Sequence, residues 1–89
     1  MNGLARSINA TATGQLDAGQ GFVLSFGLCA GADAATAVLR TGGASGTIVG
    51  KLACAANTSD SRTFISGVPY SNLHVTLTGT APNFEAEVG

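Results

Sequence analysis

The most constraining feature of this chain is a strict alternation of apolar and polar residues near its C-terminus. Residues 73–78 read Leu-His-Val-Thr-Leu-Thr, and residues 84–88 read Phe-Glu-Ala-Glu-Val. A period of two places the apolar side chains on one face of an extended strand and the polar side chains on the other. Each segment is therefore predicted to be a half-buried β-strand. Because residues 79–83 are rich in turn formers, we expect the two strands to form an antiparallel hairpin.

The rest of the chain shows the same pattern of short strands separated by Gly-rich turns. Four further strands are predicted, at residues 22–29, 35–40, 47–54 and 62–66. The predicted inward faces are Phe22, Leu24, Phe26 and Leu28 in the first strand, and Ile48, Gly50, Leu52 and Cys54 in the third. No capped ten-residue stretch has helical spacing. The sequence therefore predicts an all-β fold, a small antiparallel β-sandwich or jelly roll of six to eight short strands.

The first 19 residues differ from the remainder because they contain few large apolar side chains. We interpret residues 1–19 as a less regular N-terminal arm, extended and able to supply one strand, which docks on its own domain or on a neighbouring copy. Residues 20–89 are predicted to form the β-sandwich domain.

Charge and composition restrict the partners of this chain. Only 10% of its residues are charged and the net charge is −1. No basic stripe is present to bind a phosphate backbone, so nucleic acid is not an expected partner. The chain also lacks an apolar run of about 18 residues and an export signal at its start, which argues against a membrane location. A thin core with a nearly neutral surface favours association with other copies.

Few residues have the chemistry of a reaction centre. His74 is the only histidine, and no sequence pattern supplies a nucleophile and a carboxylate to accompany it. Glu85 and Glu87 project from one face of the last strand, where we interpret them as protecting a sheet edge. Cys29 and Cys54 are predicted to be reduced thiols rather than a disulfide. We therefore expect no enzymatic activity, no metal and no cofactor.

Several residues have the character of a protein interface. Tyr70 combines an apolar ring with a polar hydroxyl, which suits either an interface or the edge of the core. The histidine lies on the outward face of its strand, and the arm contributes one basic and one apolar residue. The interface candidates are Arg6, Ile8, Tyr70, Asn72 and His74.

The C-terminal half contains a succession of strand segments and turns at residues 37–40, 43–49, 67–73 and 75–81, followed by a short end strand. In this succession the chain resembles small all-β virion proteins of tailed bacteriophages. The resemblance implies a capsid decoration or cement protein that binds the outer shell as a homotrimer. Its partners would be other copies and the major capsid protein or another virion protein, and its location the virion, assembled in the host cytoplasm. The alternative is a carbohydrate- or receptor-binding module on a fibre or tail, with Tyr70 and Asn72 contacting a glycan.

Overall fold

Two of the six strands are much longer than the sequence predicted, and they organise the fold. The computed structural model describes residues 6–89, and β2 and β5 contain 16 and 20 residues. All neighbouring strands are antiparallel, in one sheet of order β1-β6-β2-β5-β3-β4. The strands are β1 (Arg6–Ala10), β2 (Gly14–Cys29), β3 (Ala35–Thr41), β4 (Thr47–Cys54), β5 (Ser59–Thr78) and β6 (Asn83–Val88). The prediction of an all-β antiparallel fold is confirmed.

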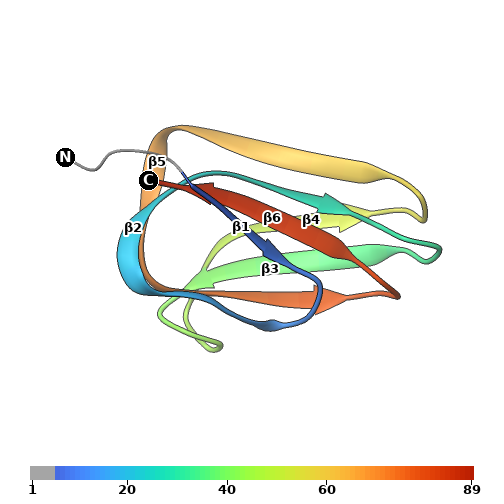
Figure 1. Ribbon diagram of the computed structural model, residues 1–89, viewed down its shortest axis with the longest axis horizontal. Coiled ribbons are helices and arrows are strands. Elements are labelled where there is room, and N and C mark those ends of the chain that lie inside the picture. The colour runs from blue at the N-terminus through green and yellow to red at the C-terminus, as the bar shows by residue number, and fades with distance from the viewer. Residues whose placement is uncertain (1–5) are drawn as a thin grey trace.

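The sheet doubles back on itself because β2 and β5 bend together. Residues 14–23 of β2 pair with residues 68–75 of β5, whereas residues 25–29 pair with residues 59–63. Between these two ladders, Leu24 alone stands opposite four residues of β5, an irregularity of the kind that bends strands. Figure 1 shows both strands curving at its left side, so that each runs through both halves of the sheet.

The bend produces two layers. We name each layer by the two strands that lie entirely within it. The β1/β6 layer consists of β1, β6, residues 25–29 of β2 and residues 59–63 of β5. The β3/β4 layer consists of β3, β4, residues 14–23 of β2 and residues 68–78 of β5. The molecule is accordingly flat, with extents of 41 × 24 × 16 Å.

The hydrophobic core lies between the two layers and takes side chains from both. Phe26 is at its centre, with ring centroids 5.8 Å from Phe64 and 6.1 Å from Phe84. The buried set is Val23, Phe26, Leu28, Ala35, Ala37, Leu39, Leu52, Cys54, Tyr70, Leu73, Val75, Phe84, Ala86 and Val88. At the two alternating segments the predicted faces are correct, since Leu73, Val75, Phe84, Ala86 and Val88 are all buried.

The predicted C-terminal hairpin is wrong. The end of β5 pairs with β3, and β6 pairs with β1 and β2. The connection between β5 and β6 therefore crosses from one layer to the other, with Gly79 and Ala81 at φ values of 108° and 54°. This crossing directs the apolar faces of both strands into the same core from opposite sides.

The predicted inward faces of β2 and β4 are wrong at one end each. Phe22 is 49% exposed and Ile48 is 43% exposed, whereas Val23 is fully buried. The register of the β2–β5 and β2–β6 ladders shifts at Leu24, and that of β3–β4 shifts at Val49. Each extra residue exchanges the two faces of the strand, because the side-chain period is two.

The beginning of the described chain is part of the same sheet. β1 pairs along its whole length with β6 of the same chain, from Arg6↔Val88 to Ala10↔Phe84. β2 begins at Gly14 and runs without interruption through residues 19 and 20, where the sequence predicted the end of the arm. Residues 1–5 of that arm lie outside the described part. Nowhere in residues 6–89 does a helix have the length and apolar character that a membrane crossing requires.

Candidate functional site

An ion-paired cluster joins the two layers at the margin where β1 lies near the first half of β2. Arg6 Nη2 is 2.8 Å from Asp17 Oδ2. The Tyr70 hydroxyl donates to the same carboxylate, and the Gly19 amide donates to its other oxygen at 3.0 Å. Two interface candidates, Arg6 and Tyr70, are thus brought together by a residue that the sequence analysis did not select. Asp17 had no sequence signal, since it is an isolated acid in a weakly patterned segment.

The electrostatics of this cluster favour a charged Asp17 and a neutral Tyr70. Hydrogen bonds from the Tyr70 hydroxyl and the Gly19 amide, together with Arg6, hold the pKa of Asp17 below its usual value. Burial and the neighbouring Asp17 carboxylate raise the pKa of Tyr70 to about 12. Because Tyr70 is only 5% exposed, its ring is part of the core. The arrangement closes the margin of the sandwich. Within the cluster, the carboxylate of Asp17 is paired with Arg6 and Tyr70, so neither acid nor base is left unpaired.

Replacing Tyr70 with phenylalanine tests this arrangement. The change removes a hydrogen bond to a carboxylate, so the free energy of unfolding at neutral pH should fall by about 1 to 3 kcal/mol. In the wild type the pKa of Tyr70 lies above its ordinary value of 10.0, so its contribution to stability is complete below pH 10 and is lost as pH rises to about 12. Urea unfolding across this range should show a loss of about 2 kcal/mol that the Tyr70→Phe variant lacks.

The composition supplies a direct readout for the same prediction. The chain has one Tyr and no Trp, so the ultraviolet absorbance of tyrosinate reports Tyr70 alone. Folded protein should ionise near pH 12 and urea-unfolded protein near pH 10. Ionisation at the same pH in both states would contradict the contact between Tyr70 and Asp17.

Asn72 and Ile8 have local structural contacts. Asn72 has a φ of 57°, its side-chain oxygen accepts from Gln15 Nε2, and its carbonyl accepts from the amides of Gly42 and Gly43. Ile8 of β1 is half-buried and packs against the core. Because Tyr70 is buried and Asn72 is held in this way, the predicted glycan platform of these two residues is not present.

His74 lies on the outer surface of the β3/β4 layer. It stands between Gln15 of β2 and Arg40 of β3 in adjacent strands. The residue is half-buried, and its Nδ1 atom is buried with no hydrogen-bond partner among residues 6–89. Its neighbours across the sheet supply no carboxylate to orient the ring and no nucleophile, the partners that a catalytic histidine needs.

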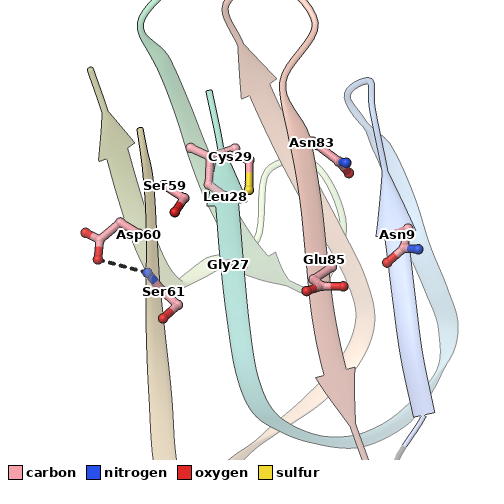
Figure 2. A pocket seen from close by; sticks show the side chains of 9 residues that line it. All are labelled: Asn9, Gly27, Leu28, Cys29, Ser59, Asp60, Ser61, Asn83 and Glu85. Atoms are coloured by element: carbon pink, nitrogen blue, oxygen red, sulfur yellow. Dashed lines mark hydrogen bonds between the residues drawn. The ribbon is translucent and has the colours of Figure 1, made fainter. Parts of the chain in front are cut away.

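The outer surface of the β1/β6 layer contains a shallow polar depression of about 310 Å³, shown in Figure 2. It forms where Gly27 has no side chain to fill the space beside Glu85. β1, β6, β2 and β5 all contribute to it, with Asn9, Gly27, Leu28, Cys29, Ser59, Asp60, Ser61, Asn83 and Glu85 as its lining. Nowhere in the described part of the chain do three or more His, Cys, Asp or Glu side chains group closely enough to hold a metal ion.

The two glutamates of β6 lie in the middle of this layer, not at its edge. β6 is paired on both sides, with β1 and β2, so the interpretation of Glu85 and Glu87 as edge protection is wrong. Both side chains are exposed on the outer surface. They make that surface acidic.

The two cysteines are free thiols in different environments. Cys29 is exposed on the outer surface of the β1/β6 layer, whereas Cys54 is buried. The Cys54 thiol points to the Leu28 carbonyl across the layers at 3.5 Å, and burial raises its pKa. Only Cys29 is therefore available to react with another molecule.

Comparisons with known proteins identify the class of fold. No protein-family model matches the chain, and no curated protein matches it. The fold is similar to that of a solved chain from work described as "Bacillus endospore appendages form a novel family of disulfide-linked pili". The TM-score is 0.57 with 23% sequence identity, over 94% of this chain and 81% of that chain. This level of identity shows a shared fold.

The same comparison corrects two functional expectations. The matched protein belongs to endospore appendages, which contradicts both the capsid decoration role and the virion location. It also gives no support to a homotrimer, to a capsid partner or to a receptor-binding module. The family resemblance itself stays a prediction.

Proposed function

We propose that this protein is a structural subunit whose copies assemble into a pilus-like fibre on the outside of a bacterial cell or spore. The observation that carries the proposal is the similarity of fold to the endospore appendage chain, which extends over 94% of this protein. The match also covers 81% of the appendage chain, so it extends over most of both chains. The proposed role is mechanical and involves no reaction.

The surface of the molecule supports association between copies. Phe22, Ile48 and Ile65 are large apolar side chains that the single chain leaves exposed, and Ile65 is 101% exposed. Among residues 6–89, β1 and β4 are the two ends of the sheet order, and each has one side without a paired strand. With only 10% charged residues, copies repel one another weakly. Each of these features is favourable in a subunit that is surrounded by others.

The cysteines determine how such copies are held together. The matched appendages are described as disulfide-linked, and a covalent polymer needs at least two linkable positions in every subunit. In these 89 residues only Cys29 is exposed, because Cys54 is buried in the core. One exposed thiol links copies in pairs at most. For contacts made within these 89 residues, we therefore infer that interactions other than disulfides join the copies.

Assembly of the purified protein tests the proposal. The protein should form multimers whose mass rises with concentration in light scattering, and fibres should be visible by negative-stain electron microscopy. A Cys29→Ser variant and wild type kept in reductant should assemble to the same extent as untreated wild type. A protein that stays monomeric at every concentration would overturn the proposal, and assemblies that dissolve in reductant would overturn the non-covalent contact.

A further inference from the structure

The two outer surfaces of the sandwich carry charges of opposite sign. On the β1/β6 layer, Glu85 and Glu87 of β6 point outward, beside Ser25 and Gly27 of β2. The outward positions of this layer are Ser7, Asn9, Ser25, Gly27, Cys29, Ser59, Ser61, Thr63, Asn83, Glu85 and Glu87. These described positions include no lysine or arginine. We call this surface the acidic face.

The outer surface of the β3/β4 layer is its counterpart. Lys51 of β4 is exposed, and Arg40 of β3 reaches over the same surface to Thr76, with 3.4 Å between Nη1 and Oγ1. His74 lies next to Arg40 in the neighbouring strand. The outward positions include Gln15, Thr36, Val38, Arg40, Ile48, Lys51, Ala53, His74, Thr76 and Thr78. None of these is an acid, and we call this surface the basic face.

Asp60 borders the depression of the acidic face, and the other charged residues of the described chain lie away from both faces. Arg6 and Asp17 form their ion pair at one margin of the sandwich. Arg62 occupies a position of β5 opposite the core residue Phe26 of β2, at the other margin. Asp33 is exposed in the connection between β2 and β3. The separation of charge between the two faces is therefore complete among the described residues.

The broad faces are large enough to form a specific contact. The molecule measures 41 × 24 Å across its broad side and is 16 Å thick. A standard protein interface buries about 800 Å² on each partner, which a face of these dimensions provides. The acidic face consists mostly of small side chains, so the larger side chains of a basic face can approach it closely.

We propose that copies of this protein stack with the acidic face of one copy against the basic face of the next. This inference rests on the proposed function and gives the fibre its repeating contact. Stacking two acidic faces would bring Glu85 and Glu87 against the same residues of another copy, and stacking two basic faces would oppose Lys51 and Arg40. Complementary charge selects the orientation. A contact between two different faces leaves one acidic and one basic face free at the ends of the stack. Further copies can therefore add, and the stack grows as an open fibre unless the rotation between neighbouring copies closes it into a ring.

Charge reversal on each face provides the test. One variant carries Glu85→Lys and Glu87→Lys, and another carries Arg40→Glu and Lys51→Glu. Each has the same sign on both faces, so each alone should need a concentration at least about tenfold higher than wild type to assemble. An equal mixture of the two should assemble at the wild-type concentration, since every contact again joins opposite charges.

Matched controls separate this contact from the effect of net charge. The single variant Glu85→Lys should also assemble less readily than wild type. Asp33→Lys changes the net charge by the same amount as this single variant but lies off both faces, so it should leave assembly unchanged. Circular dichroism and thermal unfolding establish that each variant is folded. If Arg40→Glu prevents folding, Arg40→Gln with Lys51→Glu takes its place, because it still gives the basic face a net negative charge. The same restoration is expected when it is mixed with the Glu85→Lys, Glu87→Lys variant.

The outcomes distinguish this inference from the proposed function. Fibres that form equally well from wild type and from both reversed variants would overturn the stacking contact and leave the fibre proposal standing. Reversed variants that fail alone and also fail when mixed would likewise overturn it. Wild type that never assembles would overturn the proposed function itself.

Discussion

Replacing Phe26 with alanine is expected to lower the free energy of unfolding by about 3 to 5 kcal/mol. Phe26 is 2% exposed and packs against Phe64 and Phe84 with centroid distances of 5.8 and 6.1 Å. Truncation removes a ring that contacts both layers, and the paired strands around it limit collapse of the cavity. In an 89-residue domain such a loss approaches the whole margin of stability. Urea unfolding followed by circular dichroism measures it.

Phe22→Ala is the matched control for this substitution. Phe22 belongs to the same strand and alternates in phase with Phe26, but it is 49% exposed because of the bulge at Leu24. Its truncation should cost about 1 kcal/mol or less. Equal losses at positions 22 and 26 would mean that β2 alternates without interruption, and would contradict the bulge.

Adding a methyl group at Gly50 is expected to destabilise the protein by about 1 to 3 kcal/mol. A Cβ at this position would lie 2.6 Å from Phe26 Cζ and 3.0 Å from Cε1. Phe26 cannot move away cheaply because Phe64 and Phe84 hold its ring. Gly50 is thus a position in β4 where a ring from the opposite layer lies against the backbone. Thermal and urea unfolding of Gly50→Ala measure the effect.

A control and a compensating variant make this prediction specific. Gly14→Ala adds the same methyl group where no atom lies within 4 Å, so its effect should remain within about 0.5 kcal/mol. Phe26→Leu shortens the side chain that the new methyl group would strike. The double variant Phe26→Leu with Gly50→Ala should therefore lose less stability than the sum of the two single changes. Additive losses would show that the two residues do not compete for the same space.

The sequence analysis was correct where local pattern decides the outcome. The strands at residues 73–78 and 84–88 and their buried faces follow from alternation alone, because neighbouring residues of a strand point to opposite sides. The analysis failed at Phe22 and Ile48, where one extra residue in a ladder exchanges the faces. The position of a bulge depends on the length and bend of the partner strand, and the sequence of one strand alone does not contain that information.

The functional role and location that we expected from the resemblance were wrong for a related reason. The segments that it used consist of turn residues and alternating strands, which many all-β domains share whatever they do. Nothing in these segments distinguishes a subunit of a virion from one of another assembly. The similarity to the appendage chain instead compares the whole arrangement of strands, with a TM-score of 0.57.

The sequence by itself determined which segments of this protein are strands and which of their faces are apolar, since both properties arise from residues within a few positions of one another. The tertiary structure alone decided that the sheet folds into two layers, that β6 crosses to the layer opposite the end of β5, and that Tyr70 meets Asp17 from 53 residues away. It also decided that the acidic and basic residues face opposite sides. Distant strands can pair in many registers that satisfy the local sequence pattern almost equally well. Only the packing of the complete core makes one of these registers more stable than the others.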